Sequence, residues 1–190
     1  MHGLINRGIQ RFVTDTYGEE KWHAATRLAG LEISDFEAMW QYDHAVTKQL
    51  LTAICALLER PYDELLEDIG TYLVSHRNVE ALRRLLRFGG VNFIEFLHSL
   101  DDLADRARLA VPDLELPRLE LTEENGERYC LRCYSADAGW GYFFTGVLRA
   151  MADDYGVLAF LDHKGSDGHC ETLEISLLET EFSVGRGFEL

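Results

Sequence analysis

Cysteine and histidine residues carry the most specific chemistry in this sequence. Cys130 and Cys133 form a Cys-x-x-Cys pair, and His169 and Cys170 follow further along the chain. Thiolate and imidazole are the usual ligands of structural zinc. The pair lies in RYCLRCYS, whose alternation predicts a strand, and residues three apart on a strand point to opposite faces. We therefore interpret the four as separate core or edge residues, with zinc binding as the alternative.

Acidic pairs supply the other groups with potential for catalysis, at Asp101-Asp102 and Asp153-Asp154. Adjacent carboxylates on a helix diverge, so a solvated surface is expected in place of a general acid and base. The sequence contains no nucleophile elbow, phosphate-binding loop or His-Glu-x-x-His pattern. These observations predict that the chain is not an enzyme.

The charge balance excludes two classes of partner. The chain has 33 acidic and 18 basic residues, which give a formal net charge of −15. Nucleic acid and anionic membrane surfaces both require a basic patch, so neither is an expected partner. No apolar run approaches the ~18 residues that cross a bilayer, and the N-terminus does not have the pattern of a secretion signal. With four cysteines that need not form a disulfide framework, this predicts a cytoplasmic protein.

Apolar residues at helical spacing dominate the first 110 positions. They predict helices over residues 4–17, 19–31, 43–58, 63–73, 79–88 and 92–110. The last of these has the longest apolar stripe, made by Phe93, Phe96, Leu97, Leu100, Leu103, Ala104 and Ala107. Ala104 is a small side chain near the middle of that stripe. It leaves room for a bulkier neighbour or for a bound molecule.

Pro112 and Pro117 end the helical half, because proline cannot continue a helix. Beyond them the pattern predicts a helix over 140–155 and strands over 119–121, 128–135, 157–163 and 170–178. Asn125-Gly126 is a hairpin signal between the first two strands. The predicted fold class is α+β, with a helical N-terminal subdomain followed by a C-terminal antiparallel sheet that packs one or two helices.

This order of elements resembles the H-NOX family of haem nitric-oxide/oxygen-binding domains. The resemblance is carried by MHGLINRGIQRFV followed by YGEEKW, by the FIEFL–LDDL helix, and by VPDLELP and CYSADAGW. It implies one domain over 1–190, with a distal helical subdomain over 1–60 and a proximal helix-plus-sheet subdomain over 61–190. It also implies a haem between them, an iron-binding histidine on the FL–LDxLH helix, and a Tyr-x-Ser-x-Arg motif that binds the propionates.

Both of these sites differ in this sequence. Ala104 stands where the iron-binding histidine is expected, and a methyl group offers iron no lone pair. The Tyr-x-Ser-x-Arg positions hold Cys133, Ser135 and Asp137, and Asp137 would repel a propionate. Pro117 corresponds to the proline that the family packs against haem. We predict that haem binding is lost or altered.

Other histidines are poor replacements for a ligand at position 104. His98 lies six residues before Ala104 on the same predicted helix and would point roughly 120° away from it. His44 and His76 lie on other predicted helices. We expect both to make surface or polar contacts, with a position facing a pocket as the alternative.

The space around Ala104 is expected to be an apolar cavity that holds an unidentified hydrophobic molecule or collapses. The predicted site residues are Leu4, Ile5, Leu73, Phe93, Leu100, Ala104, Pro117, Cys133, Ser135, Asp137, Phe144 and Leu148. The predicted function is a sensor or ligand-binding module, and the resemblance implies a signalling partner such as a histidine kinase or a cyclic-di-nucleotide enzyme. The alternative is a ligand-free regulatory protein that uses the fold as a docking surface.

Overall fold

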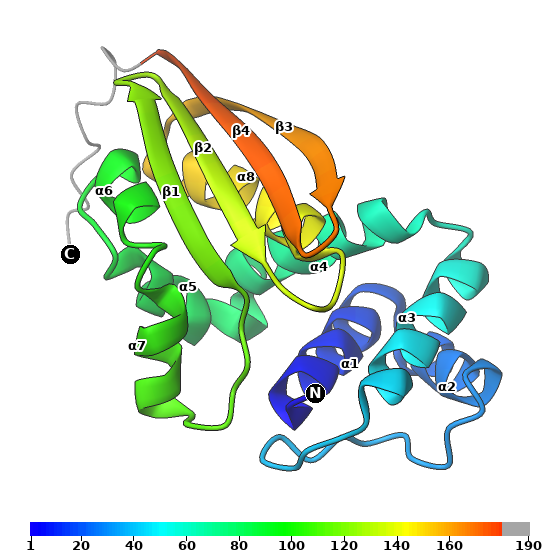
Figure 1. Ribbon diagram of the computed structural model, residues 1–190. Coiled ribbons are helices and arrows are strands. Elements are labelled where there is room, and N and C mark those ends of the chain that lie inside the picture. The colour runs from blue at the N-terminus through cyan, green and yellow to red at the C-terminus, as the bar shows by residue number, and fades with distance from the viewer. Residues whose placement is uncertain (180–190) are drawn as a thin grey trace.

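The structure is a computed structural model that describes residues 1–179 of the chain. Helices form most of the first 110 residues, and a sheet with one long helix follows (Figure 1). The elements are α1 (Gly3–Tyr17), α2 (Glu19–Leu28), α3 (His44–Leu58), α4 (Tyr62–Ser75), η1 (Arg77–Val79), α5 (Glu80–Arg87), α6 (Phe93–His98), α7 (Leu103–Ala110), β1 (Arg118–Asn125), β2 (Arg128–Tyr134), α8 (Trp140–Tyr155), β3 (Leu158–Asp167) and β4 (Cys170–Glu179). Within 1–179, none of these helices combines the length and the apolar character that a bilayer crossing requires.

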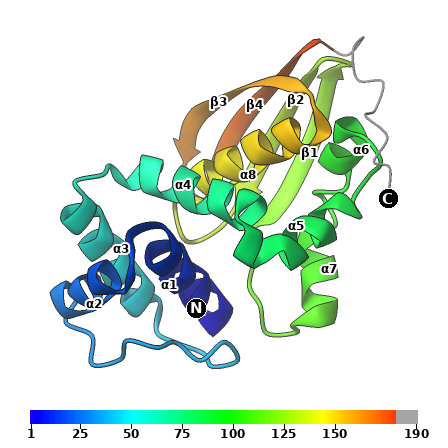
Figure 2. The same cartoon turned by 180° about the vertical axis from the view of Figure 1, so that it is seen from behind.

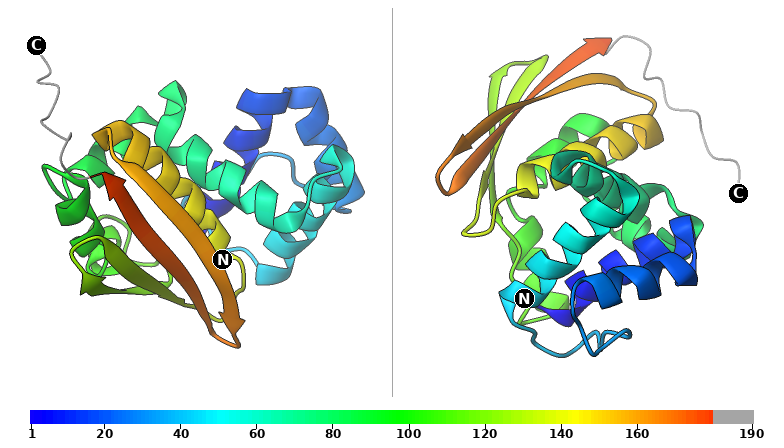
Figure 3. Two further views of the ribbon diagram at one scale, coloured as in Figure 1. Left: turned by 90° about the horizontal axis from the view of Figure 1, so that it is seen from above. Right: turned by 90° about the vertical axis from the view of Figure 1, so that its right-hand side faces the viewer.

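The sheet has four antiparallel strands in the order β1-β2-β4-β3. Helix α8 lies against one face of it (Figure 2), and no helix within residues 1–179 covers the opposite face (Figure 3). Leu131, Leu173 and Ile175 point toward α8 and are fully buried, whereas Arg132 and Glu174 point away and are exposed. This alternation is the pattern of a sheet with one packed and one solvated face. The predicted α+β class, with a helical part followed by an antiparallel sheet, is confirmed.

Two hydrophobic clusters form the core. The first is built by α1–α4 and the loop before α3, where Phe36 is fully buried and the Trp22 indole donates to the Ser34 carbonyl at 2.6 Å. The second fills the space between the sheet, α8 and α6. Helix α4 contributes Ile69 to the first cluster and Val74 to the second. The proposed division at residue 60 stays a prediction, and residues 180–190 of the predicted domain lie outside the described part.

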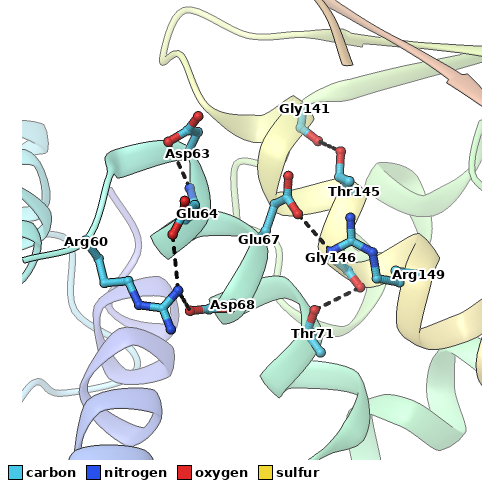
Figure 4. A network of polar contacts seen from close by, with 10 residues as sticks. All are labelled: Arg60, Asp63, Glu64, Glu67, Asp68, Thr71, Gly141, Thr145, Gly146 and Arg149. Atoms are coloured by element: carbon cyan, nitrogen blue, oxygen red, sulfur yellow. Dashed lines mark hydrogen bonds and ion pairs between the residues drawn. The ribbon is translucent and has the colours of Figure 1, made fainter. Parts of the chain in front are cut away.

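The backbones of α4 and α8 cross at two glycines. A Cβ atom on Gly70 would lie 2.1 Å from the Phe143 carbonyl oxygen, and one on Gly146 would lie 2.0 Å from the Glu67 carbonyl oxygen. Around the crossing, Thr71 Oγ1 donates to the Gly146 carbonyl at 3.3 Å, and Arg149 pairs with Glu67 at 2.8 Å (Figure 4). Because any side chain at either glycine would collide with backbone, the helices could not approach this closely with another residue there.

We predict that Gly146→Ala destabilises the protein by roughly 1–3 kcal/mol, because the added methyl must push the two helices apart. The measurement is the free energy of unfolding from a urea titration. Gly8→Ala is the matched control, since a Cβ at that position of α1 has no neighbour within 4 Å. The control is expected to be neutral or to gain up to about 1 kcal/mol. Equal stability of the two variants would contradict the account of the crossing.

The predicted continuous helix over 92–110 is wrong, because α6 ends at His98 and α7 begins at Leu103. Tight hydrogen bonds close the turn between them, from Leu100 N to the Leu97 carbonyl and from Leu103 N to the Leu100 carbonyl. Two side-chain contacts hold the turn. Asp101 Oδ1 accepts from Leu121 N of β1 at 2.6 Å, and Arg106 donates to the Ser99 carbonyl at 2.9 Å. The apolar stripe is therefore shared between two short helices that change direction at 99–102.

Other predicted boundaries shift by a few residues. The second helix ends at Leu28 and not at residue 31, because Gly30 adopts a φ of +69° and the Leu31 amide turns back to the Thr26 carbonyl. Strand β3 continues to Asp167 and not to residue 163, so the turn to β4 is shorter than predicted. The predicted helix over 140–155 agrees with α8 at both ends.

A polar cluster joins the C-terminal ends of α1 and α4. Asp15 Oδ2 accepts from the Tyr72 hydroxyl at 2.5 Å and from the Asn78 side chain at 2.9 Å, and His76 Nδ1 lies 3.6 Å away. Burial by itself would raise the pKa of Asp15, but these hydrogen bonds and the nearby His76 outweigh it and lower the pKa below its ordinary value. Folding therefore favours the charged carboxylate.

The sign of this shift predicts a pH dependence. A carboxyl whose pKa is lower in the folded state adds stability above its unfolded pKa of about 3.9, and the gain disappears as pH falls through the folded pKa. We expect Asp15→Asn to reduce the free energy of unfolding at pH 7, with a difference from the parent that shrinks below about pH 4. Asp105→Asn, at an exposed pair with Arg108, is the control and should have a much smaller effect. A loss of stability that is constant from pH 7 to pH 3 would argue against the Asp15 assignment.

Candidate functional site

A pocket of about 300 Å³ lies where the N-terminus, the start of α3, the segment before β1, the end of β2 and the start of α8 come together. Its lining residues are Met1, His44, Glu115, Leu116, Pro117, Tyr134, Ser135, Ala136, Asp137 and Trp140. Three predicted site residues, Pro117, Ser135 and Asp137, are thus brought together although they come from two separate segments. This volume is at the lower end of the range for small-molecule pockets, ~300–1,000 Å³.

An ion-pair geometry crosses the pocket from α3 to the loop after β2. His44 Nδ1 lies 2.9 Å from Asp137 Oδ2, and both side chains are about half exposed. Asp43 caps α3 by accepting from Ala45 N at 2.8 Å, which places His44 at the first residue of the helix. On the other side, Ser135 Oγ accepts from the Asp137 amide at 3.1 Å. The Asp137 carboxylate is therefore held between the helical part and the sheet.

A buried carboxylate anchors the same loop from beneath. Glu171 of β4 accepts from the Gly139 amide at 3.0 Å and from the Gly141 amide at 2.9 Å, at the start of α8. Negative charge is favourable at a helix N-terminus, where the first amides have no partner within the helix. Gly139 has a φ of +105°, a conformation that favours glycine, and lets the chain turn into the helix. Glu171 thus fixes the direction in which the loop over 135–140 leaves the sheet.

His163 of β3 completes this arrangement. Its Nε2 atom lies 3.6 Å from Glu171 Oε1, and its ring stacks on Tyr142 with centroids 4.0 Å apart. Sequence reasoning did not select His163 or Glu171. One signal was available, because Glu171 occupies an inward position in the alternating strand CETLEISL, where the other inward residues are apolar. An inward carboxylate on a strand needs polar partners, and the start of α8 supplies them.

Most of the other predicted site residues lie in the core and not at this pocket. Phe93, Leu100, Cys133, Phe144 and Leu148 are buried in the cluster between the sheet and α8. Ala104 is 8% exposed and is the buried residue of α7. Ile5 and Leu73 are partly buried against the helical cluster, and Leu4 is 36% exposed on α1. A common cavity lined by these residues stays a prediction.

The histidines considered as replacement ligands lie in three different places. His98 is on α6, separated from Ala104 by the turn, and its ring lies 3.6 Å from Glu123 and edge-on to Tyr129. His76 caps η1 and stacks on Tyr72. His44 faces the pocket, paired with Asp137. Because His98 and Ala104 lie on two different helices, the predicted angle of roughly 120° between them on one helix is wrong.

The four cysteines are free thiols. Cys130 and Cys133 are both buried on β2, and only Cys133 belongs to the core cluster under α8, which agrees with opposite faces of the strand. Among residues 1–179, no group of three or more His, Cys, Asp or Glu side chains is arranged to hold a metal ion. Burial raises the pKa of the Cys133 thiol well above its ordinary value, with a further contribution from Glu171.

A second hollow, of about 580 Å³, lies between α2 and the ends of α1 and α3. It is lined by Tyr17, Glu20, Lys21, His23, Ala24, Arg27 and Leu57. It is larger than the first pocket, but it contains none of the predicted site residues. Its lining is mainly the charged outer surface of α2, so we place the candidate site at the smaller pocket.

The family of the chain is clear from comparison with known proteins. The Haem-NO-binding (HNOB) family model matches residues 2–158, so the chain belongs to the HNOB, or H-NOX, family. The fold agrees with solved structures, including the H-NOX protein from K. algicida in the unliganded Fe(II) state (TM-score 0.80, 21% identity, all of both chains covered). The H-NOX protein from S. oneidensis in the Fe(II)NO state gives a TM-score of 0.79 at 15% identity, covering 94% of this chain and all of that one.

Curated relatives include much longer proteins. Soluble guanylate cyclase gcy-31 of Caenorhabditis elegans is 25% identical over 154 residues, which is 81% of this chain and 22% of that protein. Soluble guanylate cyclase 89Db of Drosophila melanogaster is 19% identical over 155 residues, 82% of this chain and 23% of that protein. The chain therefore spans less than a quarter of the length of these two relatives.

The residues present do not fit haem in the manner that the family resemblance implies. Ala104 carries a methyl group, which has no donor atom for iron. Asp137 places a carboxylate, paired with His44, where a cation would be needed to bind a propionate. Cys133, which the resemblance places at the tyrosine position, is buried in the core cluster. On the correspondence that the resemblance implies, the misfit concerns both ends of the cofactor.

The burial of Cys133 predicts its reactivity. In the native protein at pH 8, we expect iodoacetamide to alkylate Cys133 at least roughly a hundredfold more slowly than Cys170, because burial both shields the thiol and suppresses the thiolate. Peptide mapping by mass spectrometry after timed quenching measures the two rates. In denaturant, the two thiols should react at similar rates. Equal native rates would contradict the packing of β2 under α8.

Proposed function

We propose that this chain is a sensor or ligand-binding module of the H-NOX type in which haem binding is lost or altered. The proposal is carried by the two residues that the resemblance places at the two ends of the family's cofactor site, Ala104 and Asp137. Ala104 is buried, so its methyl group faces protein and not water. Asp137 belongs to a pocket that includes Pro117 and Ser135, which supports the proposal that the propionate end persists as a pocket with the opposite charge.

The proposal also includes how the module passes on its signal. We propose that it is regulatory and not catalytic, acts in the cytoplasm, and passes a change between the helical part and the sheet to a signalling protein. The candidate partners are a histidine kinase or a cyclic-di-nucleotide enzyme. Support comes from the candidate pocket, which is lined both by α3 and by the loop that leads into α8. A ligand bound there would contact both parts at once.

A second candidate function is a ligand-free regulatory protein that uses the fold as a docking surface. One observation favours it. The predicted cavity residues Phe93, Leu100, Phe144 and Leu148 pack in a single core cluster, and each is no more than 2% exposed. Ligand titration separates the two functions. A binding module gains stability in proportion to ln(1 + [L]/Kd), whereas a docking protein responds to its protein partner alone.

Haem titration tests the proposal directly. The parent protein, expressed with haem supplied, is expected to lack a Soret band, and Ala104→His combined with Asp137→Arg is expected to gain haem affinity. The reason is that the first change restores a donor for iron and the second a cation for a propionate. Absorption spectra and haem content by mass spectrometry measure the gain.

Ala107→His combined with Asp137→Arg is the matched control, since it places an imidazole one turn further along α7. It should gain less than the first variant. A parent protein that binds haem as tightly as the Ala104→His, Asp137→Arg variant would refute the loss of haem binding. Equal gains by the two variants would show that position 104 is not the ligand position.

A further inference from the structure

We propose that the pocket at Asp137 binds a small organic cation, an alkylammonium of a few carbon atoms. This inference rests on the proposed function, because it requires the pocket to be available to a ligand other than haem. The pocket's own residues support it through their charge and their aromatic and apolar surface, and the pocket has a volume of about 300 Å³.

The charge of the lining favours a cation. Glu115 and Asp137 contribute carboxylates from two different segments, and none of the ten lining residues is a lysine or an arginine. The nearest arginine in sequence, Arg118, is engaged elsewhere, since its guanidinium lies 4.3 Å from the Tyr134 ring and contacts Glu120. Two other groups that can carry positive charge line the pocket, and both are engaged: the N-terminal ammonium donates to the Tyr42 carbonyl at 2.7 Å, and His44 pairs with Asp137 at 2.9 Å. An anionic ligand would meet two carboxylates with little compensation.

Asp137 is positioned to receive an ammonium group. Its Oδ2 atom faces His44 at 2.9 Å, while its Oδ1 atom makes no hydrogen bond with any residue in the described range 1–179. Ser135 accepts a hydrogen bond from the Asp137 amide, and Glu171 accepts one from the amide of Gly139 in the same loop. The loop that carries the Asp137 carboxylate is therefore fixed in position. A preorganised acceptor loses less conformational freedom when a ligand binds.

The walls of the pocket favour an organic cation over a metal ion. Trp140 and Tyr134 are aromatic, and aromatic faces attract organic ammonium groups. Trp140 is held by an edge-on contact with Phe143, whose ring centroid is 5.4 Å away. Leu116 and Pro117 supply apolar surface for a short alkyl chain. A hard metal ion would need several converging oxygen ligands, and no such cluster is present within 1–179.

The test compares three probes that share a four-carbon chain, namely butylammonium chloride, sodium butyrate and butan-1-ol. With the full chain at pH 7 and constant ionic strength, butylammonium should raise the midpoint of thermal unfolding and give a saturable isotherm in calorimetry. Butyrate and butan-1-ol should give neither. Asp137→Asn and Glu115→Gln should each weaken butylammonium binding by roughly tenfold or more, because each removes a charged acceptor.

Glu124→Gln is the matched control, because it removes one exposed carboxylate at the hairpin end of β1, roughly 20 Å from Pro117 along the strand. It should leave butylammonium binding unchanged. Equal responses to butylammonium and butyrate, or an equal loss of affinity in the Glu124→Gln control, would overturn the proposal. So would the absence of any saturable binding of butylammonium to a parent protein that is folded.

Failure here is distinguishable from failure of the proposed function. If the parent protein is free of haem but does not bind butylammonium, the proposed cation site is overturned. The proposed loss of haem binding is then unaffected. A parent that binds haem, with butylammonium unable to compete, would overturn both. Both proposals are supported if the haem-free parent binds butylammonium, Asp137→Asn loses this binding, and Glu124→Gln keeps it.

Discussion

The contact between the backbones of α4 and α8 is the constraint on which the rest of this structure depends. Gly70 and Gly146 allow the two helices to cross so closely that a single added methyl at either position would collide with a carbonyl oxygen. Helix α4 belongs to both hydrophobic clusters, and α8 covers the sheet. The crossing therefore fixes the helical part of the molecule relative to the sheet. It also determines where the start of α3 meets the loop that leads into α8.

A second constraint sets the geometry of the candidate site. Glu171 reaches from the sheet to the first amides of α8 and holds the loop that carries Asp137. From the opposite side, His44 approaches from the first residue of α3. The pocket thus lies at a contact between elements that are far apart in the sequence. A ligand or a change of charge in this pocket would alter contacts with both the helical part and the sheet, which is the property expected of a sensor.

Membership of the H-NOX family fixes the fold more firmly than the chemistry. Solved family members agree with this chain at TM-scores near 0.8 with 15–21% identity. Such a fold can be kept while the residues of its site change, because packing requires volume and apolar character and the site requires particular atoms. On the proposed correspondence, Ala104 would satisfy the first requirement and not the second, and Asp137 would keep a polar loop with the opposite charge.

The sequence by itself determined the element types, the α+β class and the family. Periodic apolar residues, capping residues and prolines act locally, so α3 with its Asp43 cap and α8 from Trp140 to Tyr155 were predictable from the residues that form them. The proposed replacements at Ala104 and Asp137 were also inferred from local motifs. The tertiary structure decided what depends on distant partners. Asp101 bonds to β1 and helps to hold the turn that interrupts the predicted helix, Glu171 turns inward because α8 offers it amides, and His44 pairs with Asp137 because two clusters meet there. These contacts join residues 20 to 93 positions apart in the chain, and no local pattern encodes such a distance.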